Sequence, residues 1–333
     1  MPLLIKRAAL IALLALPPAA GADYSSHPDA EAVANRLAEE AGFEREAVLA
    51  ILAEAERKER ILEAISRPAE KAKPWHEYRK IFLTEEREEA GVAFYAEYRE
   101  TLERAAAETG VPAEIIVAII GVETYYGRIM GSYRVLDALS TLAFDYPRRS
   151  PFFTSELENY LILTRDQDLD PLAFKGSYAG AMGYGQFMPS SYRNYAVDFD
   201  GDGVIDIWNN PVDAIGSVAN YFKRHGWRPG EPVVYSAAAT AAVDDAIFVR
   251  KRADLKPRYT VAELAEKGFA SDADVGAEAM ATAMEFELAK GYEHWLGLHN
   301  FYVITRYNHS AMYAMSVYQL SLRIAAAVAE QGA

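Results

Sequence analysis

The sequence predicts a mainly helical α+β protein with a small inserted lobe that contains β-strands. Ala, Glu, Leu and Arg dominate residues 29–66, and apolar positions recur there at helical spacing. The segment 112–124 is apolar on all sides, which is typical of a buried helix. Strand-like runs first appear after Trp227, and most of them fall within 228–290.

The N-terminus has the anatomy of a secretory signal peptide. Lys6 and Arg7 precede an apolar run of nine residues, and Ala20-Gly21-Ala22 supplies a site with small residues. A short membrane anchor is the alternative, but a bilayer span needs about 20 apolar residues. We therefore predict removal of residues 1–22, with cleavage between Ala22 and Asp23, and export to the periplasm.

The composition excludes several classes of protein. The chain has no cysteine, so it forms no disulfides and cannot carry the lipid-bearing Cys of a bacterial lipoprotein. Its formal net charge is −14, whereas nucleic-acid binding needs a basic face. We expect a soluble periplasmic monomer, and its length allows two or three lobes.

The first half of the chain reads as two helical units. Residues 23–74 form an N-terminal helical lobe that ends in the break from Pro68 to Pro74, and the aromatic segment 75–82 is a linker that packs on the next unit. One long helix is predicted over 84–109, capped by Thr84 and ended by Gly110. Pro112 opens the apolar helix, which Gly127 ends. Further helices are expected over 134–144, 152–165 and 211–225, which complete a unit spanning 75–227.

The last third of the chain mixes strands and helices. Strands are predicted over 233–237, 247–251 and 284–288, and a short helix over 260–268. These elements define a small mixed lobe over 228–290, to which we assign no chemistry. Residues 291–333 then return to the core, with a strand-like run over 301–305 and an amphipathic helix over 310–330.

Glu123 is the candidate general acid. It ends the most hydrophobic helix of the chain, and a carboxyl beside apolar walls has a raised pKa because its ionised form is disfavoured. A raised pKa lets a carboxyl hold its proton near neutral pH. The alternative is a Glu that caps the helix end or forms a salt bridge there.

A second candidate segment, 175–190, is rich in Gly and other small residues. Glycine lets the backbone approach a ligand closely. The segment offers polar groups and apolar surface side by side, from Ser177, Tyr178, Tyr184, Gln186, Met182, Phe187 and Met188. A Gly-rich turn between helices is the alternative interpretation.

Together these segments carry a family resemblance. Gly-Val-Glu-Thr at 121–124, Ala-Gly-Ala-Met-Gly-Tyr-Gly-Gln-Phe-Met-Pro-Ser at 179–190 and Tyr-Asn-His-Ser at 307–310 strongly resemble the B-type membrane-bound lytic murein transglycosylases. The similarity runs from about Tyr78 to Leu320 and omits most of 228–290. The missing lipid-bearing Cys is a departure that concerns membrane attachment.

The resemblance implies a lysozyme-like core and peptidoglycan glycan strands as the substrate, with no organic cofactor. Glu123 would be the sole acid/base for cleavage between MurNAc and GlcNAc, with 1,6-anhydro-MurNAc ends as product. The implied groove residues are Ser177, Gln186, Tyr307, Asn308 and Tyr313, with walls from Tyr78, Met182, Phe187 and Tyr221. Arg148 and Arg149 would hold carboxylates of peptide stems, or else form a surface pair bonded to nearby acids.

One carboxylate is enough for such a reaction. An ordinary glycosidase uses two carboxylates, and Asp137, Asp145 and Asp166 do not lie in segments that look like a site. In a transglycosylase the MurNAc 6-hydroxyl replaces water as the nucleophile. The alternatives are a hydrolytic muramidase and a non-catalytic, calcium-stabilised glycan-binding scaffold.

Residues 198–209 follow the pattern of an EF-hand loop. Asp198, Asp200, Asp202 and Asp206 stand at loop positions 1, 3, 5 and 9, Gly203 stands at position 6, and Val204 offers its carbonyl. Asn209 replaces the usual Glu at position 12, so Asp213 is the expected closing ligand. We predict a structural Ca²⁺ site here; an acidic surface turn is the alternative.

Overall fold

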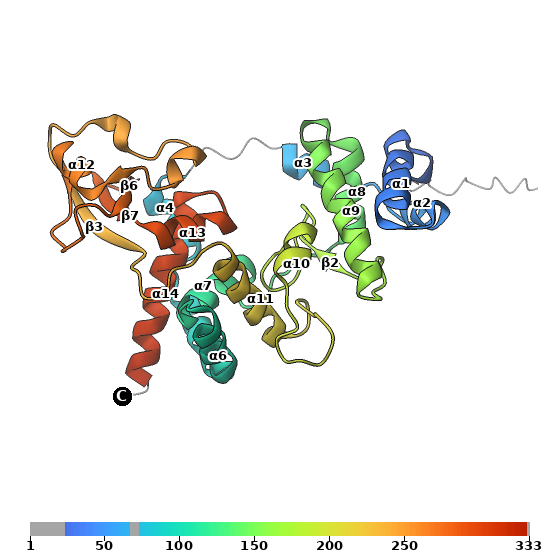
Figure 1. Cartoon of the computed structure of the whole chain (residues 1–333), viewed down its shortest axis with the longest axis horizontal. Helices are drawn as coiled ribbons and strands as arrows, with labels where there is room; N and C mark the ends of the chain where they lie inside the picture. The colour runs from blue at the N-terminus through green and yellow to red at the C-terminus, as the bar shows by residue number, and fades with distance from the viewer. Residues whose placement is uncertain (1–23, 67–72, 332–333) are drawn as a thin grey trace, which may run out of the picture.

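The computed structural model describes residues 24–66 and 73–331, which form three lobes in a row (Figure 1). Helices α1 and α2 lie at one end, the β-strands gather at the other, and the central helices, including α7 and α11, lie between them. The predicted signal peptide, residues 1–22, lies outside the described residues.

The N-terminal lobe consists of a 3₁₀ helix and three short α-helices: Tyr24–Ser26, α1 (Pro28–Ala41), α2 (Arg45–Ala53) and α3 (Glu59–Ser66). Tyr24 is buried, its ring packs 5.1 Å from the ring of Phe144, and its hydroxyl donates to Asp145. Both partners belong to α8 (Val135–Asp145). The first described residue of the lobe therefore packs against α8 and forms a hydrogen bond with it.

The segment after the gap, which was predicted as an aromatic linker, is helical. It forms α4 (Trp75–Tyr78) and a 3₁₀ helix (Arg79–Ile81). Trp75 is 1% exposed, packs on Phe286 with ring centroids 5.1 Å apart, and donates from Nε1 to Glu293 at 2.6 Å. Trp75 therefore packs on the strand that contains Phe286, and Tyr78 and Phe82 pack against the main hydrophobic core.

The predicted long helix over 84–109 is two helices, α5 (Glu85–Glu97) and α6 (Arg99–Thr109). Tyr98 interrupts them with φ −109° and ψ 25°, and its ring packs on Phe94 at 4.8 Å. Both predicted ends are confirmed. Thr84 Oγ1 accepts from the backbone N–H of Arg87, and Gly110 ends α6 in the left-handed conformation.

The apolar helix is α7 (Ala113–Thr124), and it forms the centre of the core. It packs against α5, α6, α11 (Pro211–Arg224) and the long α14 (Ala311–Gln331). Pro112 stands one position before the helix. Tyr125, and not Gly127, is the residue that ends it, with φ 52°.

The remaining core elements follow the predicted order with three additions. The predicted helices over 134–144, 152–165 and 211–225 are confirmed as α8, α9 (Ser150–Asp166) and α11. The sequence analysis did not predict α10 (Pro189–Tyr195) or the pair of short strands β1 (Tyr133–Arg134) and β2 (Lys175–Gly176).

Among the described helices, none is by itself long and apolar enough to cross a membrane. The pair α6 and α7 reaches the required length and composition only when counted together, and the chain bends by 113° between them. Burial in the core accounts for the apolar surface of α7.

The β-lobe is an antiparallel sheet in the order β4-β6-β7-β3-β5. Its elements are β3 (Val234–Ala239), β4 (Tyr259–Thr260), α12 (Val261–Glu266), β5 (Phe269–Ala270), β6 (Met280–Glu287) and β7 (Tyr292–Gly297). Strand β7 carries the sheet past the expected boundary at 290. The strand predicted over 247–251 is wrong: two 3₁₀ helices (Asp245–Ile247 and Arg252–Leu255) flank one bridge from Phe248 to Ala283. Ile247 and Phe248 are apolar because they fill the core of this lobe.

The strand predicted over 301–305 is also wrong, because these residues lie in α13 (His299–Tyr307). Phe301, Val303 and Ile304 are buried. Their aromatic and β-branched side chains favour strands weakly, and tertiary packing against α14 overrides that preference. The helix predicted over 310–330 is confirmed as α14.

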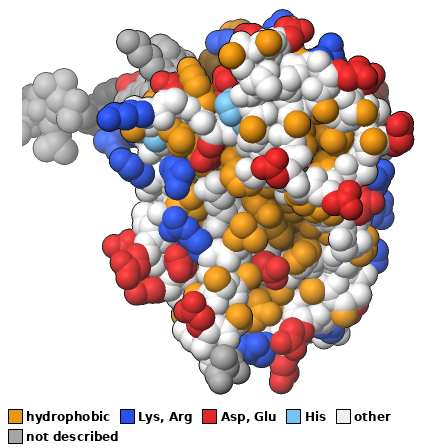
Figure 2. Space-filling view, turned by 90° about the vertical axis from the view of Figure 1, so that its left-hand side faces the viewer, with side chains coloured by type: hydrophobic (Ala, Val, Ile, Leu, Met, Phe, Trp, Pro, Cys, Tyr) orange, Lys and Arg blue, Asp and Glu red, His pale blue; other side chains and the backbone are white. Residues whose placement is uncertain are grey.

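Figure 2 shows hydrophobic side chains gathered in a hollow on one face of the molecule.

Candidate active site

Glu123 lies in the last turn of α7, where the helix meets α14. The hydroxyl of Tyr313, from α14, donates to Glu123 Oε1 at 2.5 Å. Glu123 is partly exposed, whereas Tyr313 is buried. The carboxyl therefore opens toward solvent on one side and is anchored to the core on the other.

The electrostatics of this position suit a proton donor. Burial raises the pKa of Glu123 from 4.5 to about 7, and the hydrogen bond from Tyr313 opposes the rise. Desolvation is the larger cause because a carboxylate loses hydration among apolar neighbours. A carboxyl with a pKa near the operating pH is suited both to give and to take a proton.

Removal of the Tyr313 hydroxyl is expected to raise the pKa of Glu123 further. In Tyr313→Phe the ionised carboxylate loses its hydrogen-bond donor while the desolvation remains. Carbon-13 NMR titration of labelled Glu side chains measures the shift. Tyr318→Phe is the control, because Tyr318 lies on the same helix and makes no described contact with Glu123. An unchanged or lower pKa in Tyr313→Phe would refute the electrostatic account.

Tyr307 connects the end of α13 to the Gly-rich segment. Its hydroxyl donates to the carbonyl of Gly185 at 2.6 Å, and its ring packs on Tyr221 and Phe222. Burial and the nearby Glu123 charge both raise the pKa of Tyr307 well above 10, so it stays neutral. A side chain at Gly185 would clash with the Tyr307 hydroxyl, since an added Cβ would lie 2.8 Å from that oxygen. The glycine thus permits the close approach.

Ser177 and Gln186 are held by backbone groups of their own segment. Ser177 Oγ accepts from the N–H groups of Ala179 and Ala181, at 3.3 and 3.0 Å. Gln186 has φ 50°, and its Nε2 donates to the carbonyls of Met130 and Gly183. The Ser177 proton and the Gln186 carbonyl oxygen have no partner among the described residues, so both are available to a ligand.

The residues expected to form groove walls differ in exposure. Tyr78 is partly exposed, and burial together with the Glu123 charge raises its pKa, which places it close to the carboxyl. Met182 is 0% exposed and Phe187 3%, so these two support the wall from beneath. Tyr221 is also buried; its hydroxyl donates to the carbonyl of Arg306 at 2.7 Å.

Asn308, Arg148 and Arg149 are among the expected site residues that make no described contact with Glu123. Asn308 follows α13 and is exposed. Arg148 and Arg149 lie in the 3₁₀ helix Pro147–Arg149 and are exposed, and Arg149 stacks on the ring of Phe152 at 4.4 Å. Within the described part of the chain neither arginine forms an ion pair.

The carboxylates considered as partners of Glu123 are engaged elsewhere. Asp137 is 1% exposed and accepts from Arg134 and from the N–H of Glu56. Asp145 accepts from Tyr24, and Asp166 pairs with Arg165 at 2.7 Å. None of the three contacts Glu123 in the described structure. These three carboxylates are therefore not placed to act together with Glu123.

Two features of the site gave no signal in the sequence. Thr124 Oγ1 lies 2.9 Å from the carbonyl of Tyr184 and accepts from the N–H of Gly127, which joins the end of α7 to the Gly-rich segment. Arg87, on α5, donates to the carbonyl of Gly121. Both contacts link residues far apart in the sequence, and no local pattern marks such pairs.

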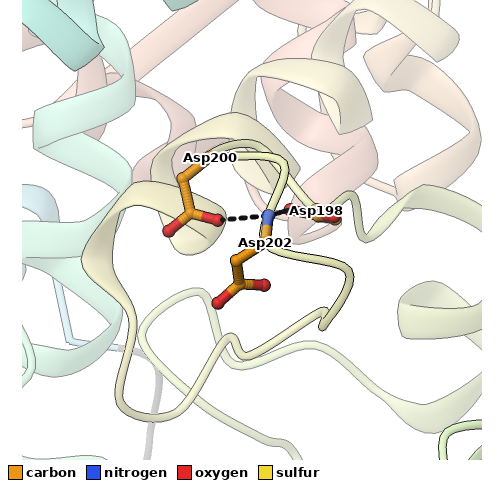
Figure 3. A group of neighbouring side chains, drawn as sticks. All are labelled: Asp198, Asp200 and Asp202. Atoms are coloured by element: carbon orange, nitrogen blue, oxygen red, sulfur yellow. Dashed lines mark hydrogen bonds between the residues drawn. The ribbon is translucent and has the colours of Figure 1, made fainter.

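The predicted metal loop brings three carboxylates together. Figure 3 shows Asp198, Asp200 and Asp202 on one turn, and one carboxylate oxygen from each lies within 4.8 Å of the others. Gly201, Asp202 and Gly203 donate their backbone N–H groups to Asp198. Three like charges this close repel one another unless a cation joins them, and carboxylates are ligands that Ca²⁺ prefers.

The other expected ligands support the loop and do not join this cluster. Asp206 accepts from the N–H groups of Trp208 and Asn209. Asp213 is 0% exposed and accepts from the N–H groups of Phe199 and Asp206, at 2.7 and 2.8 Å. Val204 is 48% exposed. The Asp213 side chain therefore closes the loop by accepting hydrogen bonds from two backbone N–H groups of the loop.

A family model and a curated relative that match this chain are both transglycosylases. The model of the transglycosylase SLT domain family matches residues 25–322. Membrane-bound lytic murein transglycosylase B of Escherichia coli K12 is 46% identical over 316 residues, which cover 92% of this chain and 85% of that protein.

Solved structures agree over the same length. The catenated lytic transglycosylase SltB1 of Pseudomonas aeruginosa is 52% identical, with a TM-score of 0.89 over 92% of this chain and 100% of that one. The Escherichia coli lytic transglycosylase Slt35 in complex with calcium is 45% identical, with a TM-score of 0.84 over 93% of this chain and 96% of that one.

Proposed function

The chain belongs to the family of SLT-domain transglycosylases, and from this membership we propose that Glu123 is its single catalytic acid/base. The protein is a lytic transglycosylase with a lysozyme-like fold, which cleaves peptidoglycan and leaves 1,6-anhydro-MurNAc ends. The observation that carries the proposal is a carboxyl that accepts from Tyr313 and has a pKa raised to about 7, with no second carboxylate beside it among the described residues.

The reaction needs one proton carrier. Protonated Glu123 donates to the glycosidic oxygen as the bond to MurNAc C1 breaks, and GlcNAc leaves with its 4-hydroxyl restored. The substrate's N-acetyl group supports the positive charge at C1. The Glu123 carboxylate then takes the proton of the MurNAc 6-hydroxyl as O6 bonds to C1. No water is consumed, and Glu123 ends protonated as it began. Intramolecular attack gains from proximity, by about 7–11 kcal/mol in favourable cases.

The neighbouring residues orient the substrate. The hydroxyl hydrogen of Ser177 and the side-chain amide of Asn308 are suited to form hydrogen bonds with the N-acetyl group. The side-chain carbonyl of Gln186 can accept a hydrogen bond from a sugar hydroxyl. Tyr78 offers an aromatic face beside the carboxyl. Arg148 and Arg149 have no acidic partner among the described residues, so they are available to carboxylates of peptide stems.

Mass spectrometry of the fragments released from purified peptidoglycan tests the reaction class. We expect anhydro-muropeptides, because the nucleophile is internal to the substrate. Fragments that carry an added water would indicate a hydrolytic muramidase. Glycan binding without any fragment would indicate a non-catalytic scaffold.

The acidic loop is proposed to bind a structural Ca²⁺. Asp198, Asp200 and Asp202 supply converging carboxylates, and Asp213 secures the loop to α11. A relative is known in complex with calcium. The ion would offset the repulsion among the three carboxylates on the turn that follows α10, and so stabilise the chain beyond Gln186.

Calcium is therefore expected to raise the thermal unfolding temperature, and a chelator to lower it. Binding at a hundredfold excess over Kd stabilises the folded state by about 2.7 kcal/mol. Asp200→Asn should abolish the calcium-dependent shift, whereas Asp274→Asn, an exposed Asp of the β-lobe, should retain it. Differential scanning calorimetry with calcium and with EDTA measures both. An equal shift in the two variants would show that the ion binds elsewhere.

We also propose export, with removal of residues 1–22, and no lipid anchor, since the chain has no Cys. We also propose that the chain divides into lobes at residues 74, 227 and 290. Strand β7 continues the sheet of the β-lobe beyond residue 290, to Gly297. Peptidoglycan is the partner of this function, and a monomer suffices because Glu123 and its neighbours come from one chain.

A further inference from the structure

Arg87 is a partly buried cation without an acidic partner. It lies in the first turn of α5, and no ion pair of Arg87 is present among the described residues. Burial lowers the pKa of its guanidinium group. A buried Arg is normally paired with a carboxylate, so its contacts require another explanation.

The guanidinium group of Arg87 is directed at the end of α7. Its Nη1 donates to the carbonyl of Gly121, Nη2 lies 3.5 Å from the carbonyl of Ile81, and Nε is buried without a hydrogen-bond partner. The carbonyl groups in the last turn of a helix carry partial negative charge, which attracts a cation. The helix end thus takes the place of a carboxylate.

The same arginine contacts both tyrosines that follow Glu123. Its guanidinium carbon lies 4.6 Å from the ring centroid of Tyr125, and its backbone carbonyl accepts from the hydroxyl of Tyr126 at 2.8 Å. Gly121 and Tyr125 each stand two residues from Glu123, one on each side. Arg87 therefore contacts the backbone before the carboxyl and the two tyrosine side chains after it.

This part of the backbone needs external support. Tyr125 and Tyr126 have φ of 52° and 59°, and Gly127 has φ 83°. Two successive non-glycine residues in the left-handed region are strained, because Cβ approaches the following carbonyl oxygen. Such a conformation persists only where surrounding contacts determine it.

We infer that Arg87 is a positioning residue for the reaction, because it holds the left-handed turn after α7 and thereby keeps Glu123 facing Tyr313. The inference rests on the proposed role of Glu123. Lysine would not replace Arg87, since only the planar guanidinium group can donate to a carbonyl while it stacks on a ring.

Arg165 provides a matched control. Its Nη1 donates to the carbonyl of Ala41, at the end of α1, at 2.5 Å, and its guanidinium carbon lies 4.2 Å from the ring centroid of Phe43. Arg165 thus makes the same two kinds of contact at a helix end far from Glu123. Both substitutions should lower the unfolding temperature, but only one should change the chemistry.

The test compares Arg87→Ala, Arg87→Lys and Arg165→Ala on soluble glycan strands of defined length, with anhydro ends as the readout. We expect kcat to fall about 10–100-fold in both Arg87 variants with KM nearly unchanged, because a misplaced catalytic group lowers the rate and not the binding. Methylguanidinium at millimolar concentration should restore part of kcat in Arg87→Ala. Arg165→Ala should keep the wild-type kcat.

The outcomes separate the inference from the proposed function. A wild-type protein that releases no anhydro ends would overturn the function itself. An active wild type with kcat unchanged in Arg87→Ala would overturn the inference alone. So would full activity in Arg87→Lys, since a charge would then be enough. A loss of kcat that methylguanidinium reverses supports the positioning role.

Discussion

The Glu123→Gln variant is expected to bind glycan strands like the wild-type protein and to release anhydro-muropeptides at a rate lower by a factor of about 10²–10⁴. The amide keeps the shape of the carboxyl and still accepts from Tyr313. It cannot give a proton to the glycosidic oxygen, and the described structure places no second carboxylate beside it. Quantitative mass spectrometry of the released fragments measures the loss.

The same variant should be more stable than the wild-type protein at alkaline pH. The folded pKa of Glu123 is about 7 and its ordinary value is 4.5. The stability contributed by the protonated carboxyl is fully present below about pH 4.5 and is lost as the pH rises through 7. Glutamine does not titrate, so Glu123→Gln should unfold at a higher temperature at pH 8, with the difference shrinking toward pH 5.

Glu114→Gln is the control for both measurements. Glu114 lies in the first turn of the same helix, at the opposite end from Glu123. Its substitution should leave the release of anhydro-muropeptides and its pH dependence unchanged. More than a few per cent of wild-type activity in Glu123→Gln would exclude this residue as the acid/base.

The Gly131→Ala variant is expected to lose about 3 kcal/mol or more of unfolding free energy. Gly131 has φ 97°, and an added Cβ would lie 2.0 Å from the carbonyl oxygen of Gly176 and 2.5 Å from the nitrogen of Ser177. Both obstacles are backbone atoms of the segment that carries Ser177, so they cannot rotate away. Denaturant unfolding measures the loss.

Gly42→Ala separates the clash from the backbone strain. Gly42 has φ 68° at the end of α1, and an added Cβ would meet nothing within 4 Å. Its substitution should therefore cost only about 1–2 kcal/mol, which is the price of the left-handed conformation alone. Equal losses in the two variants would show that the β1–β2 region relaxes around the new methyl group.

Local sequence patterns predicted much of the fold. The helices α1 to α3 lie in the segment where apolar spacing indicated helices, and α8, α9, α11, α12 and α14 lie in the ranges predicted for single helices. Thr84 and Gly110 mark helix ends because each satisfies backbone groups within its own turn. Tertiary packing of side chains decided the elements that local patterns did not predict. Tyr98 divides a predicted helix, and residues 301–305 are helical although their composition favours a strand.

The sequence by itself determined that Glu123 ends an apolar helix, that a Gly-rich segment and an acidic loop follow it, and which family these motifs resemble. Tertiary structure alone decided how the site is assembled. Tyr313 reaches Glu123 across 190 positions, and Arg87 reaches Gly121 across 34. Helical periodicity and capping depend on neighbours within one or two turns, whereas these contacts depend on how α5, α7 and α14 pack together.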